Sequence, residues 1–444
     1  MTGRETTAQD GTGRDATGRE TSGRETSGRD ATGRETTGRD GTGRDATGRE
    51  TSGQDRTGRD ATGRETSGRD GAGQEPNLLV VDAGSSSLSL TVLDGEGHEL
   101  TAQHLTEAPG PETPAVLADF LKDAPPVGAT GHRIVHGGPR LLHPTVVDDD
   151  VRAELDRVAE LAPLHVPPAL TALDAARAHL PDVPHVACFD TAFHDGLPPA
   201  ARAYALPREW RERYGLRRYG FHGLSYAWAL RRAAELLGRQ TDSLHVVLAH
   251  LGGGCSVTAV RDGRSVDTSM GFTPLEGLVM SKRSGSVDPG LLLHLQTSAG
   301  LSAAQLEDAL NHESGLLGLS GTSGDTRDLV RAAAGGDAEA AFALDVFTLS
   351  VRRGIASVAA SLDRIDALVF TGEIGEDQPE VREAVCSGLG VLGVTGGLTS
   401  DNRTDDAVVS PHGAAVPVLV ITTGETRQVE AETRAVLGRT GAKG

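Results

Sequence analysis

The residues from Gly271 to Pro289, GFTPLEGLVMSKRSGSVDP, place a lone arginine, Arg283, in a loop that is dense in turn-forming residues. Glycine, serine and proline follow it closely, and these residue types favour tight turns over helix or strand. A planar guanidinium held in such a loop offers several hydrogen-bond donors to an oxyanion. The segment therefore predicts an anion-binding arginine, although a solvated surface arginine would have the same local sequence.

Four further segments each combine Arg, His or Asp with Gly or Pro: GHRIVHGG from Gly131 to Gly138, LAPLH from Leu161 to His165, FDTAFH from Phe189 to His194, and RYGFHG from Arg218 to Gly223. Together with the Arg283 segment, and in this order, they resemble the acetate kinase family. The resemblance extends from about Asn77 to the C-terminus. It implies an α/β, two-domain duplicated fold of the acetate and sugar kinase, Hsp70 and actin type.

The resemblance also implies an activity: phosphoryl transfer between ATP and a short-chain carboxylate such as acetate or propionate, giving ADP and the acyl phosphate. Two anions meet in this reaction, so the protein must neutralise and align charge. By resemblance, Arg133 and Arg283 act on the carboxylate and the transferring phosphoryl group. His222 steadies that group with support from His165, and Asp190 orients an arginine or the acyl group. The alternative interpretation is structural: histidines buried in the core, and an Asp–Arg ion pair without a catalytic role, would produce the same sequence.

Other site residues are also implied by the resemblance. The acyl pocket would be lined by Val135, Leu164, Phe221 and Pro274. The nucleotide would contact His250, Leu251, Gly252, Gly253, Gly254, Asp325, Thr326, Arg327, Gly372, Glu373, Ile374, Gly375 and Glu376. Asp82 and Glu425 would hold Mg²⁺, which prefers one or two carboxylates together with phosphate and water. The family likeness further implies a homodimer.

Five positions depart from the family pattern. Asp82 and Gly253 stand at asparagine positions, Ser89 at a lysine position and Val166 at an asparagine position. Glu373 occupies a glycine position in the loop that resembles the adenosine site, where it adds bulk and negative charge. The sequence therefore leaves these hypotheses open: the protein is an enzyme that uses ATP, an enzyme that uses another phosphoryl donor such as pyrophosphate, or a non-catalytic ligand-binding or scaffolding relative. A binding relic would not need to keep a whole set of site residues, and this set is retained: Arg133, Asp190, His222, Arg283 and Glu425. Their joint retention favours an enzyme.

Two segments predict the elements that would position these residues. The first, 77–97, and the second, 244–264, each show a strand, a glycine turn, a second strand and an Asp-Gly turn. A third glycine turn follows an apolar strand within 367–377, and tight turns of this kind expose backbone N–H groups to phosphate oxygens. Ordinary hairpins would show the same pattern.

Apolar periodicity predicts helices over 337–362 and 425–437, and a further helix over 325–334 in which Asp325 is also the N-cap. We expect a first domain of 76–190 with the C-terminal helix 426–444, and a second domain of 191–425.

The first 75 residues repeat a five-residue unit close to Thr-Gly-Arg-Asp/Glu-Thr/Ala, with 13 arginines against 15 acids. This composition cannot bury a core and predicts a disordered tail. Either a translated expanded repeat or an interaction arm would fit it.

The remaining residues carry a net charge of −17, which is −19 minus −2, and this argues against a nucleic-acid or anionic-membrane partner. Three widely spaced cysteines and the absence of a long apolar run predict a cytoplasmic protein with reduced thiols.

Overall fold

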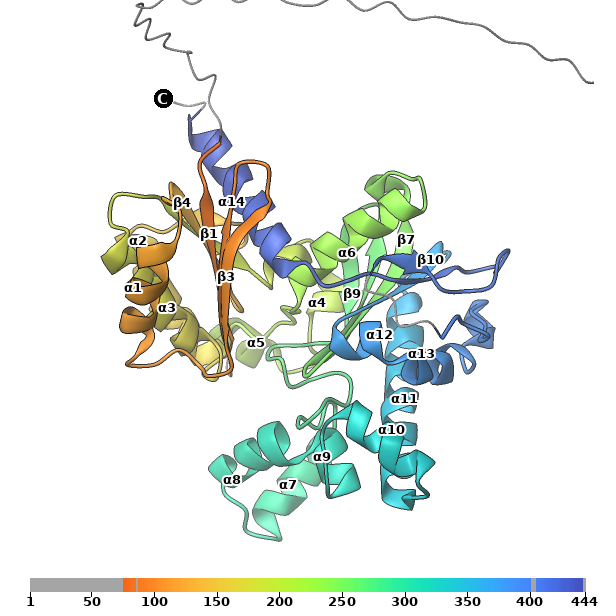
Figure 1. The fold of residues 1–444 in the computed structure, drawn as a ribbon. Coiled ribbons are helices and arrows are strands. Elements are labelled where there is room, and N and C mark those ends of the chain that lie inside the picture. The colour runs from red at the N-terminus through yellow and green to blue at the C-terminus, as the bar shows by residue number, and fades with distance from the viewer. Residues whose placement is uncertain (1–74, 85–86, 401–404, 442–444) are drawn as a thin grey trace, which may run out of the picture. The chain divides into compact units, whose positions relative to one another are not determined.

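The computed structural model describes residues 75–84, 87–400 and 405–441, which lie in one compact unit of the chain, Asp70–Gly444. Two six-stranded sheets with helices around them make up this unit (Figure 1). The repeat tail expected over residues 1–75 lies outside the described residues except for Glu75.

The first sheet is built from strands between Leu78 and Phe189. Its order is β3-β2-β1-β4-β6-β5. The strands are β1 (Leu78–Ala83), β2 (Leu88–Leu93), β3 (Glu99–Leu105), β4 (Ala129–Ile134), β5 (Thr145–Val146) and β6 (His185–Phe189). β1, β2 and β3 form an antiparallel meander, while β4 and β6 run parallel to β1. β1 and β6 are mostly apolar because helices cover both faces of the sheet, whereas β4 also carries His132 and Arg133.

The second sheet repeats this plan. Its order is β11-β12-β10-β7-β8-β9. The strands are β7 (His245–Leu251), β8 (Cys255–Arg261), β9 (Arg264–Thr268), β10 (Ala367–Thr371), β11 (Ala407–Val408) and β12 (Val418–Val420). β7 to β9 again form an antiparallel meander, and β10 and β12 are parallel to β7. Both hairpins expected from the sequence are therefore present, and the predicted duplicated α/β fold is confirmed.

Helices link and cover the sheets. The α-helices are α1 (Thr113–Asp123), α2 (Asp149–Val158), α3 (Val166–His179), α4 (Pro199–Arg202), α5 (Arg208–Tyr214), α6 (Gly223–Leu236), α7 (Pro289–Thr297), α8 (Ala303–Asp308), α9 (Gly315–Ser320), α10 (Thr326–Ala334), α11 (Ala338–Ala359), α12 (Glu373–Asp377), α13 (Pro379–Cys386) and α14 (Glu425–Gly441). Short 3-10 turns lie at Ala159–Leu161, Ala192–His194, Thr241–Ser243 and Gly390–Leu392, and a π-helical turn lies at Ala309–Glu313.

The helix expected over 337–362 is α11, which buries Phe347, Val351 and Ile355 against the second sheet. Asp325 caps α10 as expected, because its side chain accepts a hydrogen bond from the backbone N–H of Arg327. A short helix, α12, also begins directly after the third glycine turn.

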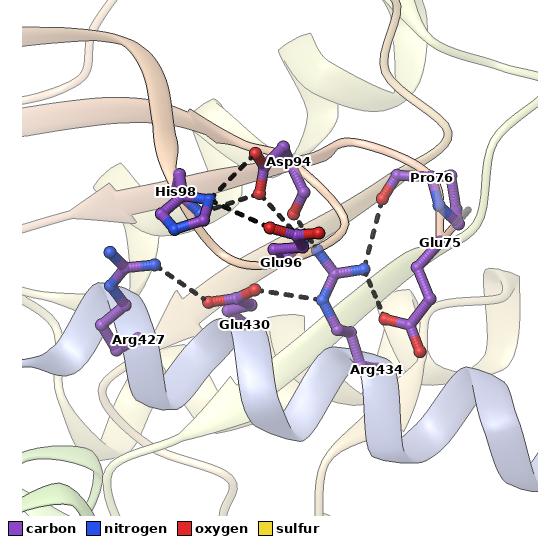
Figure 2. Close-up of polar contacts among 8 residues, drawn as sticks. All are labelled: Glu75, Pro76, Asp94, Glu96, His98, Arg427, Glu430 and Arg434. Atoms are coloured by element: carbon purple, nitrogen blue, oxygen red, sulfur yellow. Dashed lines mark hydrogen bonds and ion pairs between the residues drawn. The ribbon is translucent and has the colours of Figure 1, made fainter. Parts of the chain in front are cut away.

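The C-terminal helix α14 packs on the first sheet through both apolar and charged contacts. Val429 shares a core with Leu78 and Val80 of β1. Figure 2 shows Arg434 at the centre of a polar cluster, where it donates to Glu430 at 3.1 Å, to Glu75 at 2.9 Å and to the Asp94 carbonyl. These contacts fix the helix whose first residue is Glu425. The domain bounds 76–190 and 191–425 stay predictions.

The three cysteines, Cys188, Cys255 and Cys386, are free and buried. Of the helices formed by the described residues, none has the length and apolar composition needed to cross a bilayer.

Candidate functional site

Three charged residues meet where adjacent strands of the first sheet end. Asp82 in β1 and Arg133 in β4 are register partners, and Asp190 follows β6 directly. Arg133 donates from Nη1 to both Asp82 oxygens at 3.2 Å and from Nη2 to Asp190 Oδ2 at 3.0 Å. The carboxyl ends of parallel strands share one edge of a sheet, and this brings residues far apart in the sequence together.

The charged groups at this edge have strongly shifted pKa values. Burial lowers the pKa of Arg133, but the carboxylates of Asp190, Asp82 and Glu425 outweigh it and raise that pKa well above its ordinary value. Burial also raises the pKa of Asp190, although Arg133 opposes this shift. At the start of α14, burial together with nearby Asp82 raises the pKa of Glu425 to about 7 although Arg133 opposes it. Clustered perturbed groups of this kind are typical of functional sites.

The second arginine, Arg283, has no acidic partner in any ion pair found within the described ranges. Its Nη1 donates to the Pro274 carbonyl at 2.8 Å, and burial lowers the pKa of its guanidinium. The loop around it contains the expected turns, with Gly285 at φ 68° and Gly277 at φ 117°. A largely buried cation without a counter-charge is costly, so an external anion would stabilise this site.

His222 lies beside Arg283 in a strained backbone conformation. Its φ of 60° is in the left-handed region, which is rare for residues with a side chain. The ring stacks on His250 at 4.1 Å between centroids, and Nδ1 lies 2.9 Å from Ser256 Oγ. A Cβ on Gly254 would lie 2.8 Å from Arg283 Nη2 and 3.3 Å from His222 Nε2. Gly254 therefore lets both groups approach the second glycine loop.

His165 faces the same region from the first half of the fold. It precedes α3, and burial together with the positive charges of Arg283 and Arg133 lowers its pKa to about 4. The structure thus brings all five predicted catalytic residues to one region, where burial, His250 and both arginines hold the pKa of His222 well below its usual value.

A pocket of about 590 Å³ lies next to this region. Six predicted nucleotide residues line it: Gly253, Asp325, Thr326, Arg327, Glu373 and Ile374. Arg327 also forms an ion pair with Asp325 at 2.6 Å, and Glu373 stands at the first position of α12.

Several predicted nucleotide residues have other roles in the structure. The Leu251 side chain is fully buried in the core, and the His250 ring packs on His222 away from this pocket. Glu376 accepts hydrogen bonds through Oε1 from the backbone N–H groups of Gly372 and Thr423, both at 2.9 Å. These residues shape the loops; Gly252, Gly372 and Gly375 supply backbone only.

The predicted acyl residues fall into two pairs. Val135 and Phe221 are almost fully buried within the core of the second half. Leu164 and Pro274 line a separate pocket of about 240 Å³ that His165 also borders. Its wall is mainly apolar, and its polar residues besides His165 are Thr273, Glu307 and Asn311.

Sequence reasoning missed some residues of the site. Ser256 contacts both His222 and Tyr226, and nothing in the local sequence indicated that role. Lys282, Ser281, Asp377 and Gln378 line the larger pocket. For Lys282, its position directly before Arg283 in the sequence could have indicated that it lies near the site.

Comparisons with known proteins agree with this geometry. The model of the acetokinase family matches residues 116–430, more than half of the chain. The chain belongs to the acetokinase family. It is 43% identical over 389 residues to an acetate kinase of Clavibacter michiganensis subsp. michiganensis, covering 80% of this chain and 97% of that protein. It is 44% identical over 386 residues to an acetate kinase of Leifsonia xyli subsp. xyli, covering 79% and 96%.

Solved structures of the acetokinase family are similar as well. An acetate kinase of Porphyromonas gingivalis has a TM-score of 0.75 at 32% identity, and the match covers 82% of this chain and all of that one. A propionate kinase of Francisella tularensis subsp. tularensis has a TM-score of 0.75 at 33% identity with the same coverage. The resemblance expected from the sequence is thereby confirmed.

The positions expected from the sequence to depart from the family pattern occupy different environments. Val166 is fully buried in the first core, so it contributes packing there. Ser89 Oγ lies 2.8 Å from His104 Nδ1 on the neighbouring strand. A Cβ on Gly253 would meet nothing within 4 Å, so glycine leaves the pocket open at this point. Glu373 remains the departure that changes the charge of the larger pocket.

Acid should destabilise the protein because several histidines are buried in its fold. Burial lowers the pKa of His165 and His194 to about 4, and of His136 and His250 to about 3. Unfolded histidines titrate near pH 6.5, so the unfolded state binds more protons below that pH and stability falls as pH falls. The raised pKa values of Glu425 and Glu432 offset part of this loss.

We expect the urea midpoint to be clearly lower at pH 5.0 than at pH 7.5, by an amount corresponding to several kcal/mol, since each unit of pKa shift is worth about 1.4 kcal/mol. Equal midpoints at the two pH values would contradict this prediction.

Proposed function

We propose that the chain is a phosphotransferase that interconverts a short-chain carboxylate and ATP with the acyl phosphate and ADP. One observation carries the proposal: Arg283, for which the described residues supply no acidic partner, lies beside His222 at a glycine loop, and Arg133 lies nearby in a carboxylate cluster. A site of this kind neutralises two anions that must approach each other.

In the proposed step a carboxylate oxygen attacks the γ-phosphorus of ATP. A new P–O bond to the acid forms as the P–O bond to ADP breaks, so no proton needs to be transferred. Arg133 and Arg283 balance the charge on the carboxylate and on the phosphoryl oxygens. His222 stays neutral because its pKa is lowered, and when Nδ1 accepts from Ser256 its Nε2–H can donate to the phosphoryl group.

Asp82 and Glu425 would hold the magnesium ion. Their electrostatic interaction and the pKa of Glu425 near 7 fit a position where a divalent cation would lower the cost of clustered carboxylates. Mg²⁺ commonly takes one or two carboxylates and completes its shell with phosphate and water. When bound, it would neutralise negative charge on the phosphate groups of ATP.

The acyl group would lie near His165, between the buried edges of Val135 and Phe221 and the smaller pocket beside Leu164 and Pro274. A volume of about 240 Å³ exceeds the needs of a methyl group. Each additional buried methylene would contribute about 0.8 kcal/mol. We therefore propose both acetate and propionate as substrates.

Trapping the acyl phosphate with hydroxylamine tests the proposed activity directly. Purified protein is incubated with ATP, Mg²⁺ and either acetate or propionate, and the acyl hydroxamate is measured. We expect product from both acids, with kcat/KM values within about tenfold of each other. Absence of hydroxamate with ATP would contradict the donor assignment, and a parallel reaction with pyrophosphate identifies the alternative donor.

Glu373 is expected to weaken ATP binding. Glu373 lines the nucleotide pocket, where Arg327 forms its ion pair with Asp325 at 2.6 Å. The substitution Glu373→Gly removes bulk and charge from a binding surface that contacts donor in both ground and transition states. We expect KM for ATP to fall several-fold while kcat changes less than twofold, the signature of uniform binding.

Glu380→Gly is the matched control for this prediction, because Glu380 is exposed in the first turn of the next helix, α13, and does not line the pocket. It should leave KM for ATP unchanged. If Glu373→Gly also leaves KM unchanged, the Glu373 side chain points to solvent when ATP is bound.

We also propose a cytoplasmic homodimer. Three free, buried thiols fit a reducing compartment. Exposed apolar side chains on α7 and α11, Leu291, Leu293, Phe342 and Leu349, supply surface that a second copy could cover. Light scattering would measure the mass in solution.

A further inference from the structure

Glu276 lies outside the site described above but within the loop that carries Arg283. Arg218 donates from Nη2 to Glu276 Oε1 at 2.6 Å, and the hydroxyl of Tyr204 donates to Glu276 Oε2. Tyr204 also accepts a hydrogen bond from the Phe272 backbone N–H at 2.8 Å. Both carboxylate oxygens of Glu276 are therefore engaged by side chains from outside the loop.

The start of the same loop is held by backbone contacts to these partners. Arg218 donates from Nη1 to the carbonyls of Ser269 and Met270, each at 2.9 Å. A Cβ on Gly271 would collide with the Glu276 carboxylate and the Tyr204 hydroxyl, so only glycine fits where these groups converge. The segment from Gly271 to Glu276 is consequently closed into a ring of contacts, which we term the Glu276 clamp: Tyr204, Arg218, Gly271, Phe272 and Glu276.

The clamp encloses the group that orients Arg283. Pro274 lies two residues before Glu276, and its carbonyl accepts from Arg283 Nη1 at 2.8 Å. The other side of Arg283 is fixed through the backbone, because Ser284 N–H donates to Leu310 O at 3.0 Å. The Pro274 carbonyl is therefore the side-chain anchor of Arg283, and Glu276 sets its position.

We propose that Glu276 is a positioning residue that acts on phosphoryl transfer through Arg283. This inference rests on the catalytic role proposed for Arg283. A purely stabilising role would give a different pattern: the ion pair between Arg218 and Glu276 is partly exposed, at 18% and 33%, and such pairs contribute little to stability. A shift of about 1 Å at a catalytic group, in contrast, can lower a rate about a hundred-fold.

A double-mutant cycle tests the proposal. Glu276→Gln, Arg283→Ala and the double variant are compared with wild type in the hydroxamate assay. We expect Glu276→Gln to lower kcat ten- to hundred-fold, with KM for ATP changed less than threefold. In the Arg283→Ala background the same substitution should change kcat less than twofold, because the residue through which it acts is gone.

Two further variants keep the test decisive. Tyr204→Phe removes one hydroxyl of the clamp without creating a cavity, and we expect it to lower kcat by a smaller factor. This variant replaces Glu276→Gln in the test if Glu276→Gln folds poorly. Glu430→Gln is the matched control, since Glu430 is a buried glutamate paired with Arg434 and Arg427 on α14. It should not change kcat.

Each outcome has one meaning. If the effects of Glu276→Gln and Arg283→Ala on kcat multiply in the double variant, Glu276 acts independently of Arg283 and the inference is overturned. If Glu276→Gln leaves kcat unchanged while Arg283→Ala lowers it, the inference is also overturned and the proposed function stands. If Arg283→Ala keeps wild-type activity, the role of Arg283 itself is wrong.

Discussion

Arg283→Ala is expected to lower kcat at least a hundred-fold and to leave the fold intact. Arg283 has no acidic partner in the ion pairs of the described residues, so its removal exposes no opposite charge in the protein. Its charge is needed most when negative charge spreads over the phosphoryl group, and an arginine in that role is worth about a thousand-fold or more in rate. The measurements are steady-state kinetics for ATP and acetate and a thermal melt.

Arg283→Lys separates charge from geometry. It keeps the positive charge but loses the planar fork that reaches both the Pro274 carbonyl and the region of His222. We expect it to recover only part of the lost activity. Arg261→Ala, at the exposed far end of β8, is the control and should match wild type. Turnover within threefold of wild type in Arg283→Ala would remove this residue from the mechanism.

Arg133→Ala is expected to lower kcat at least a hundred-fold and also to destabilise the protein, by about 3–5 kcal/mol. Arg133 contacts Asp82 and Asp190, and its charge also acts on Glu425. Without it, three neighbouring carboxylates remain with no counter-charge. Kinetics and urea unfolding at two pH values measure the two effects.

The pH dependence of Arg133→Ala has a defined sign. Loss of the arginine raises the folded-state pKa of Asp190 and Glu425 further above their unfolded values, so the folded state takes up protons as pH falls. The stability deficit relative to wild type should therefore be smaller at pH 6 than at pH 8. A deficit that is the same at both pH values would show that Arg133 stabilises the fold by packing and not by charge.

Local sequence patterns determined much of the fold. The two hairpins were predictable because Asp-Gly turns and alternating apolar residues specify a strand pair within about 20 residues. α11 and α10 were predictable from apolar periodicity and from the N-cap at Asp325. The Arg283 loop was predictable as a turn-rich segment because it contains glycines, which adopt the positive φ of tight turns far more readily than other residues. The roles of the site residues came from the family resemblance.

Tertiary structure alone decided how those residues are used. Arg133 reaches Asp82 and Asp190 because parallel strands align segments more than 50 residues apart, and no local pattern specifies that register. The same holds for the stack of His222 on His250, because His222 precedes α6 and His250 lies in β7. The side chain of Leu251, which was expected to contact the nucleotide, is buried in the core because successive strand residues face opposite sides of a sheet. The sequence by itself determined which chemical groups are present and which turns carry them, whereas long-range packing decided their partners, burial and charge.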